Sequence, residues 1–309
     1  MSLIDNVRAT LKSAETEGPF ELYVTRTPGY LWACLFRWLG IHPVAVTLMS
    51  IVIGAASGWF FYSEEPGMNL IGMGLLIWAN WYDCADGQLA RMTDKRTLIG
   101  RILDGFCGDV WFFFIYLFLC LRMQGHDIPF TEVKWGVWIW LLAAWSGLRC
   151  HGRQCAIGDY YRNIHLYFLL GSDRAELDSS VNIREEMRGL RWNSHEWFHK
   201  LYLYFYARYT GSQEDQVRVF GRMMSRLKAK YGKELPRALR EEFCRGSRPL
   251  MPLTNILTFD TRVIVLFLCI GFGTPWLYFV FESTVLELIR FYMIRRHEAL
   301  CQSIIERYT

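Results

Sequence analysis

Three aspartates near the ends of two predicted helices form the pattern in this sequence that is best suited to chemistry. Asp83 and Asp86 lie three residues apart, with Ala90 four residues later, so the three positions share one helical face. Asp104 follows Gly100 by four residues at the start of the next apolar segment. Two antiparallel helices would bring the three carboxylates together. Because carboxylate oxygens suit Mg²⁺, Mn²⁺ or Ca²⁺, we predict a site where two divalent cations hold a substrate diphosphate.

Small and basic residues beside these aspartates suit a phosphate group. Gly87 and Ala90 would let a phosphate or a nucleotide approach the helix backbone closely. Arg91 offers a forked guanidinium donor. The alternative, helix-end charges that face water, would be reasonable for a single aspartate. Uncompensated carboxylates are costly at a membrane, however, so the group as a whole favours cation binding.

The stretch from Asp83 to Asp104 resembles the signature of the CDP-alcohol phosphotransferase family. That signature reads D-x-x-D-G-x-x-A-R, then eight residues, then G-x-x-x-D-x-x-x-D. The eight intervening residues of this chain are Met92–Ile99. A match of this length is specific, and it lies between two predicted membrane spans, as it does in the family.

A weaker resemblance lies at the start of the first predicted span. Pro43 and Thr47 are similar to the family's Pro-Asn-x-x-Thr pattern, although Val44 replaces the Asn. The resemblance covers residues 25–160 and 250–296 and is strong only in the signature.

The resemblance implies an activity and a set of roles. The family transfers a phospho-group from a CDP-linked alcohol to an acceptor hydroxyl with two divalent metals, Mg²⁺ or Mn²⁺. Asp83, Asp86 and Asp104 would be metal ligands. The residues that would line the nucleotide-phosphate site are Gly87, Ala90, Arg91 and Gly100. A homodimer through membrane helices is also implied.

The chain departs from the family at the last aspartate of the signature, which is the family's general base and a metal ligand. That position is Gly108, and Asp109 comes one residue late. In a regular helix, Asp109 would point about 140° away from Asp104. A π-bulge at Gly105 and Gly108 would restore its direction. We predict Asp109 as the base and a further metal ligand if the bulge exists, and His151 as the base if the helix is regular.

A second departure is a basic segment after the fourth predicted span. Arg149 and Arg153 are predicted to bind an anionic head group. His151 between them could shuttle protons near neutral pH, and a structural role is the equal alternative. Asp260 and Arg262 lie inside an otherwise apolar segment, where a structural ion pair and a functional role are equally open.

The composition favours a membrane protein. Of 309 residues, 52% are hydrophobic and 16% aromatic, which excludes a disordered chain, and aromatic residues gather at bilayer interfaces. The net charge of +4 is too small to indicate nucleic acid. Six apolar runs predict six membrane helices, the third extended back to Asp104. They are Val44–Tyr62, Pro66–Tyr82, Val110–Leu121, Trp135–Leu148, Pro249–Phe272 and Thr274–Ile294.

The distribution of charge predicts four regions and an orientation. Residues 1–43 would be an interfacial segment, 44–171 four spans with the motif, 172–249 a cytoplasmic basic and aromatic helical insertion, and 250–309 two spans with a tail. Mixed basic and aromatic residues in the insertion suit either an anionic membrane surface or an ordinary solvated helical region. The positive-inside rule places the motif on the cytoplasmic side. The resemblance to bacterial members of the family implies a bacterial inner membrane.

We therefore predict an all-α integral membrane transferase of substituted phosphate groups in phospholipid or sphingolipid synthesis. The long insertion and the shifted aspartate resemble bacterial members of the family that make inositol phosphoceramide, so the predicted reaction moves a phosphoinositol-type head group to ceramide. The donor would be a phospholipid or a CDP-lipid. One alternative is phosphatidylinositol-phosphate or phosphatidylglycerol-phosphate synthesis from CDP-diacylglycerol with a polyol acceptor. Another is a non-catalytic membrane scaffold.

Overall fold

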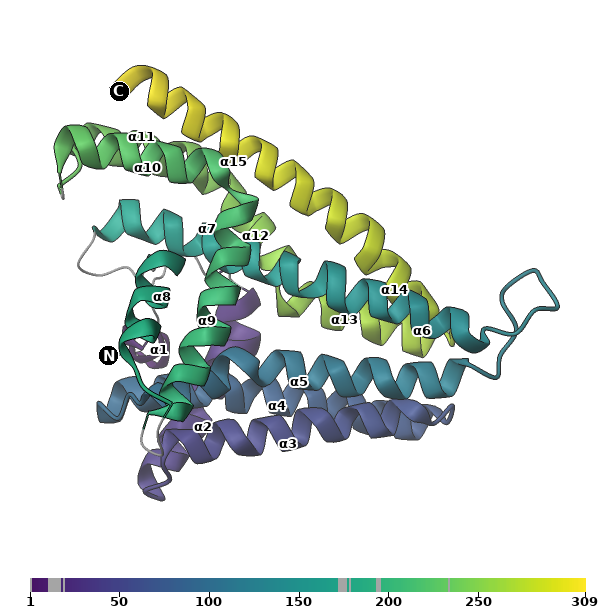
Figure 1. Ribbon diagram of the computed structural model, residues 1–309. Coiled ribbons are helices and arrows are strands. Elements are labelled where there is room, and N and C mark those ends of the chain that lie inside the picture. Colours follow the sequence, from purple (N-terminus) through teal and green to yellow (C-terminus); the bar gives the residue numbers. More distant parts are fainter. Residues whose placement is uncertain are drawn as a thin grey trace. The chain divides into compact units, whose positions relative to one another are not determined.

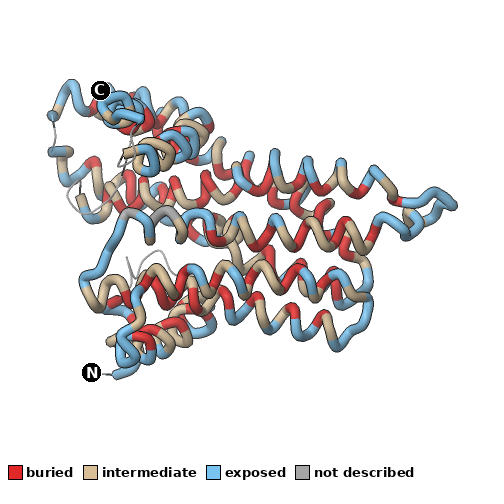
Figure 2. The backbone as a smooth tube through the Cα atoms, turned by 60° about the horizontal axis from the view of Figure 1, so that its bottom comes forward, coloured by how far each residue is buried: buried red, intermediate tan, exposed pale blue. Residues whose placement is uncertain are grey.

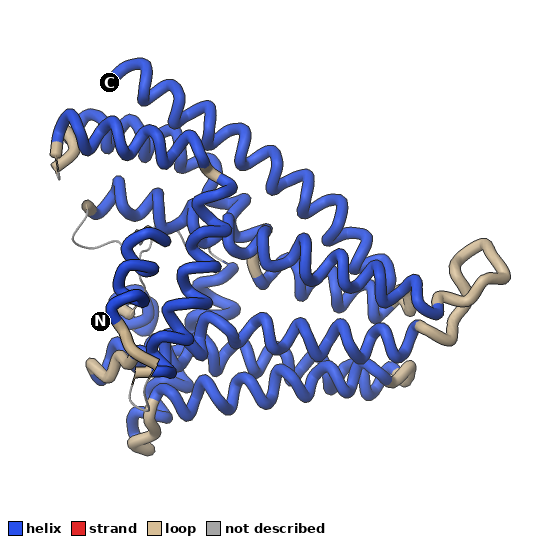
Figure 3. The backbone as a smooth tube through the Cα atoms, viewed as in Figure 1, coloured by secondary structure: helices blue, strands red, loops and turns tan. Residues whose placement is uncertain are grey.

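The computed structural model of the chain is helical throughout the part that it describes. The described residues are 2–10, 18, 20–171, 177, 179–192, 196–232 and 234–309. Figure 3 shows helices joined by loops, and the described residues contain no strand, which confirms the all-α prediction. Parts of the predicted interfacial segment and the 171/172 boundary lie outside the described residues. The chain divides into two compact units, Met1–Gly152 with Phe259–Thr284 and Arg153–Thr258 with Val285–Thr309.

The first unit holds the motif and most of the apolar helices (Figure 1). Its α-helices are α1 (Leu3–Ala9), α2 (Thr27–Trp38), α3 (Pro43–Tyr62), α4 (Pro66–Thr93), α5 (Leu98–Met123), α6 (Gly136–Ala144), α13 (Phe259–Gly271) and α14 (Trp276–Phe281). Its π-helices are η1 (Glu21–Arg26), η2 (Trp145–His151) and the first part of η4 (Glu282–Leu286).

Helix α3 is the common support of this unit because it packs along both α4 and α5. Two of its glycines allow the close approach. A Cβ at Gly54 would lie 2.2 Å from the indole of Trp111, and one at Gly58 would lie 2.8 Å from the backbone of Phe114. Small residues permit such contacts between membrane helices. The packing of α3 therefore fixes where the end of α4 and the start of α5 lie.

Two helices among the described residues are long and apolar enough to cross a membrane. They are Pro43–Tyr62 and, within α5, Leu103–Met123. A third would require Arg237–Leu257 and Phe259–Gly271 to count as one bent span. Because α5 supplies 21 residues from Leu103, the expected extension of the third span back to Asp104 agrees with the structure. The full set of six spans and the interfacial helix stay predictions.

The second unit is a separate group of helices with its own buried aromatic contacts. Its helices are α7 (Gly152–Leu170), α8 (Ser180–Gly189), α9 (Trp197–Gln216), α10 (Arg218–Tyr231), α11 (Arg237–Ser247), the 3₁₀ turn η3 (Arg248–Leu250), α12 (Met251–Leu257) and α15 (Glu287–Tyr308). The ring of Phe168 stacks on Phe243 at 3.8 Å, and Tyr161 stacks on His297 at 4.1 Å. Figure 2 shows buried residues recurring along the helices, as amphipathic packing requires.

Candidate active site

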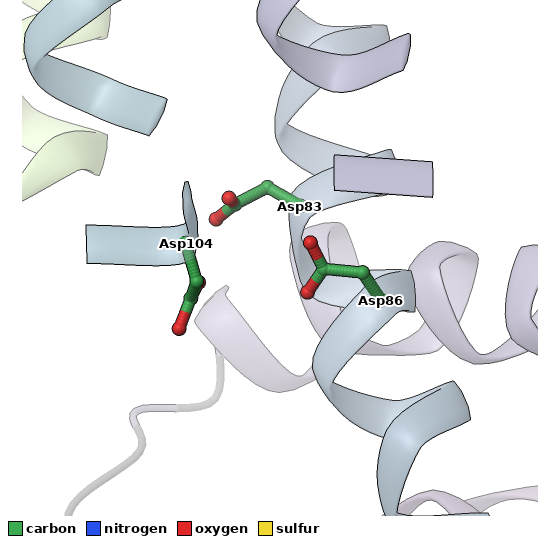
Figure 4. Close-up of side chains that lie close together, drawn as sticks. All are labelled: Asp83, Asp86 and Asp104. Atoms are coloured by element: carbon green, nitrogen blue, oxygen red, sulfur yellow. The ribbon is translucent and has the colours of Figure 1, made fainter. Parts of the chain in front are cut away.

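Asp83, Asp86 and Asp104 come together as the sequence predicts. Each offers a carboxylate oxygen, and these atoms all lie within 4.8 Å of one another. Figure 4 shows Asp83 and Asp86 projecting from α4 toward Asp104 on α5. Asp86 is buried, Asp83 is half-buried and Asp104 is exposed, so the group opens to solvent on one side.

Helix α3 also supports this cluster chemically. The hydroxyl of Thr47 donates a short hydrogen bond to the carboxylate of Asp86. One turn further along α3, the Ser50 hydroxyl donates to the carbonyl of Ala79 on α4 at 2.6 Å. The indole of Trp111 on α5 donates to the Ser50 carbonyl at 3.0 Å. The Thr47 position of the weak family pattern therefore has a physical role, because it orients one of the three aspartates.

The donor set of this cluster fits a divalent cation. Asp83 Oδ1 is buried and has no hydrogen-bond partner within the described residues. An isolated buried carboxylate oxygen is costly, and two further carboxylates lie beside it. Hard divalent cations take oxygen ligands of this kind. The arrangement therefore supplies what such a cation requires.

The small residues and Arg91 lie around the same end of α4. The guanidinium of Arg91 folds over Gly87, where a Cβ would lie 3.4 Å from Nη1, and its Nε donates to the carbonyl of Thr10. Gly100 has a local role, since its N–H donates to Thr97 Oγ at 3.0 Å and caps α5. A Cβ at Gly100 would lie only 3.0 Å from that oxygen.

Residues 40–153 match the family model described as CDP-alcohol phosphatidyltransferase. Over these residues the chain is similar to CDP-alcohol phosphatidyltransferases. It is therefore a transferase of substituted phosphate groups, and the domain implies transfer between a CDP-alcohol donor and an alcohol acceptor in membrane lipid synthesis. All three clustered aspartates lie inside the matched residues. No curated protein and no solved structure matches the chain.

Within this transferase domain, α5 is a regular α-helix from Leu98 to Met123. The π-bulge considered for Gly105 and Gly108 is absent from these residues. Asp109 is exposed, and the carboxylate cluster found in the described chain does not include it. A five-residue step in a regular helix directs Asp109 about 140° from Asp104. Gly105 and Gly108 show that glycine permits a bulge without producing one.

His151 lies in the π-helix η2 of the transferase domain and is buried. Its Nδ1 lies 2.8 Å from Oε1 of Glu282, and its ring packs on Phe112 with the centroids 4.6 Å apart. Phe112 follows Asp104 by eight residues in α5, which is about 12 Å along the helix axis. The structure therefore places His151 in a second polar group, two helical turns from the acidic cluster.

The second polar group centres on Glu282, which is fully buried in the transferase unit. Five side chains of the described residues donate hydrogen bonds to its carboxylate. They belong to Tyr116, Ser146, His151, Arg262 and Tyr278. Nδ1 of His151 lies 2.8 Å from Glu282 and also 3.2 Å from Nη1 of Arg262, so it contacts both members of the buried ion pair. We call these six residues the Glu282 network.

Sequence reasoning missed the centre of this network. Glu282 and Arg262 lie 20 residues apart and form a fully buried ion pair. Charged residues inside apolar segments are the signal that could have found them, because intramembrane charges are normally paired. The spacing does not follow a helical period, so the sequence alone could not choose Glu282 as the partner of Arg262.

The two predicted head-group arginines lie in different units. Arg149 is exposed on η2 in the first unit. Arg153 belongs to the second unit, where it lines a cavity with Arg184 and Arg208. Each is therefore described with its own unit.

Proposed function

We propose that the chain transfers a phosphoinositol-type head group to ceramide, with Asp83, Asp86 and Asp104 as ligands of two divalent cations, Mg²⁺ or Mn²⁺. The observation that carries the proposal is the convergence of these three carboxylates, one with a buried oxygen that lacks a protein donor, inside the matched transferase domain. Such cations neutralise the phosphate charge and polarise the bond that breaks.

The residues of this chain have distinct tasks around the donor phosphate. Thr47 holds Asp86 in its orientation through the short hydrogen bond. Gly87 leaves the helix surface open beside the guanidinium of Arg91. Arg91 is placed to exchange its contact with the Thr10 carbonyl for a phosphate oxygen, since a guanidinium forms stronger bonds to an anion than to a neutral carbonyl. Positioning and charge neutralisation account for most of the catalysis in phosphoryl transfer.

The acceptor hydroxyl must lose its proton as it attacks phosphorus. Helix α5 is regular, which is the case in which we expected His151 to be the base, but His151 is buried about two helical turns from the cluster. We therefore assign that proton to Asp109, the exposed carboxylate that follows Asp104 along α5. The acceptor oxygen forms a bond to phosphorus, the bond from phosphorus to the leaving group breaks, and the proton passes to the Asp109 carboxylate. The exposure of Asp109 leaves its carboxylate accessible to a substrate hydroxyl.

His151 is the second candidate for the base because one specific observation favours it. The carboxylate of Glu282 lies 2.8 Å from Nδ1 of His151 and holds the ring in the way that a carboxylate orients a catalytic histidine. The variants Asp109→Asn and His151→Gln separate the two assignments. Loss of transfer in Asp109→Asn alone supports Asp109, loss in His151→Gln alone supports His151, and full activity of both contradicts both.

The choice of substrate rests on two departures from the family. The position of the signature's last aspartate is Gly108, and a helical unit begins at Arg153, the last matched residue. The second candidate function is phosphatidyl transfer from CDP-diacylglycerol to inositol phosphate or glycerol phosphate, which the description of the matched family favours directly.

A purified-protein assay separates these functions. In the presence of Mg²⁺ or Mn²⁺, ceramide with phosphatidylinositol should give a phosphoinositol ceramide and diacylglycerol. Ceramide with CDP-inositol should give the same product and CMP. Release of CMP from CDP-diacylglycerol with inositol phosphate or glycerol phosphate, and no ceramide product, would replace the proposal by the second candidate. The absence of turnover with every pair would favour a non-catalytic scaffold. We further propose a homodimer in the bacterial inner membrane with the cluster on the cytoplasmic side, which light scattering and sided cysteine labelling can test.

A further inference from the structure

A cavity in the second unit concentrates arginine side chains, two of them beyond the residues matched by the transferase family. Its volume is about 480 Å³, and arginines from three successive helices line it, namely Arg153 of α7, Arg184 of α8 and Arg208 of α9. The other lining residues are Ser180, Gly211, Ser212, Glu214 and Asp215. Three guanidinium groups facing two carboxylates give the lining a net positive charge. Arginine forks match the geometry of phosphate oxygens.

Local contacts explain how the cavity keeps its shape. The carboxylate of Glu214 accepts the backbone N–H of Ser180 at 3.1 Å and a short bond from the Ser180 hydroxyl, so it is held at the start of α8. Gly211 lets the arginine of α8 lie close to α9, since a Cβ there would lie 3.2 Å from Arg184 Nη2. The guanidinium of Arg208 lies near its own helix through a 3.3 Å bond to the Tyr204 hydroxyl.

A stripe of exposed aromatic side chains runs along α9, the helix that also lines the cavity. The stripe consists of Trp197, Phe198, Tyr204, Phe205 and Tyr209, which are 41–49% exposed. At 100° per residue these positions fall within an arc of about 140°, and Arg208 and Ser212 fall within the same arc. One face of α9 therefore presents large aromatic rings along most of its length and the arginine cavity near its end.

The combination of exposed aromatic rings with an arginine-lined cavity favours a lipid surface over a soluble phosphate compound as the binding partner. Exposed rings of Trp and Tyr suit the interfacial layer of a bilayer. Two helices of the chain are long and apolar enough to span a bilayer. We propose that the aromatic face of α9 lies in the surface of an anionic membrane and that the arginine cavity binds the phosphate of a lipid head group there. This site is separate from the transferase reaction and needs no turnover.

Hydrogen exchange of the full chain in lipid nanodiscs tests the proposal. Peptides covering α9 should exchange several-fold more slowly in discs that contain phosphatidylglycerol than in discs of phosphatidylcholine alone. The double variant R184Q/R208Q should lose this difference. Each substitution should raise the phosphatidylglycerol fraction needed for half-maximal protection about fivefold, which corresponds to the roughly 1 kcal/mol per basic residue near an anionic surface. The variant F205S/Y209S should lose protection in both kinds of disc.

The control is R237Q on α11, whose arginine has a 91% exposed side chain in the same unit and pairs with Glu241 outside the cavity. It should behave like the unmodified chain, and unchanged unfolding temperatures in detergent show that the cavity variants fold. Equal protection of α9 by inorganic phosphate in phosphatidylcholine discs would overturn the lipid assignment in favour of a soluble anion. Protection that depends on protein copies per disc rather than on lipid would overturn it in favour of a second copy of the chain.

Discussion

The first unit contains two groups of polar side chains built around carboxylates, and the carboxylates of the two groups have opposite surroundings. The cluster of Asp83, Asp86 and Asp104 brings three acidic groups together and leaves a buried oxygen of Asp83 without a donor among the described residues. The Glu282 network brings one acidic group together with five side-chain donors, including a buried arginine. A carboxylate that already has its donors is satisfied by the protein itself, whereas a group that lacks them can receive something from outside.

The contrast also separates what each group contributes to the protein. The Glu282 network joins α5, η2, α13 and α14 through one carboxylate, so it acts as an internal tie between helices far apart in sequence. The acidic cluster joins only α4 and α5, and both helices already rest on α3. Loss of a charge should therefore cost activity in the first group and stability in the second.

The largest expected effect comes from removing a charge in the acidic cluster. Each of Asp83→Asn, Asp86→Asn and Asp104→Asn should lower transfer by at least roughly 10³-fold, because several kcal/mol of charge stabilisation by the cations is lost. The unfolding temperature in detergent should hardly change. EDTA should reproduce the loss in the unmodified protein, and added Mg²⁺ or Mn²⁺ should restore activity. Full activity in chelator would remove the cations from the reaction.

The matching change in the other group should act on stability. Glu282→Gln leaves the buried Arg262 without its counter-charge and should lower the free energy of unfolding by about 3–5 kcal/mol. Thermal unfolding in detergent measures it. Tyr278→Phe removes a peripheral donor and should cost only about 1 kcal/mol. The pair Glu282→Gln with Arg262→Met should lose less than Glu282→Gln alone, and equal losses would show that the ion pair is not the main tie.

The stability of the protein should depend on pH because of a buried histidine that belongs to neither carboxylate group. In the second unit, burial lowers the pKa of His297 to about 3, from an ordinary value near 6.5. The unfolded chain therefore binds a proton there between these values and the folded chain does not. Stability is fully present above about pH 6.5 and should fall by up to 1.4 kcal/mol per pH unit toward pH 3. Unfolding at several pH values should show a shallower slope in His297→Phe, and an identical slope would contradict the assignment.

The smallest expected effect concerns the hydroxyl group that orients Asp86 in the acidic cluster. Thr47→Val keeps the shape of the side chain but removes the hydroxyl that orients Asp86. The concentration of Mg²⁺ needed for half-maximal activity should rise about 10- to 100-fold, because groups that orient metal ligands contribute by this amount. Thr47→Ser retains a hydroxyl and should stay close to the unmodified protein. An unchanged metal requirement in Thr47→Val would show that Asp86 needs no such support.

The difference between the two groups also explains what could be predicted from the sequence. Asp83 and Asp86 share a helical face because of a local spacing, and Asp104 follows after one short turn, so simple periodicity brings the cluster together. The all-α class follows from apolar runs and was equally accessible. Glu282 and His151 are 131 residues apart, and their meeting depends on how distant helices pack, which no local pattern states.

The π-helix η2 has a consequence for how mutations act along the chain. Ser146 and His151 lie five positions apart, as Asp104 and Asp109 do, yet both reach the same carboxylate of Glu282. A wide turn closed by bonds from i to i+5 brings a residue five positions on back to nearly the same side, which a regular turn does not. The π-helical segment Trp145–His151 thus holds one residue more per hydrogen-bonded turn than a regular α-helix would. Deleting a single residue there would leave a continuous helix with better local geometry. It would still disconnect Ser146 or His151 from its acceptor, Glu282. A change that makes the backbone regular would therefore weaken the Glu282 network.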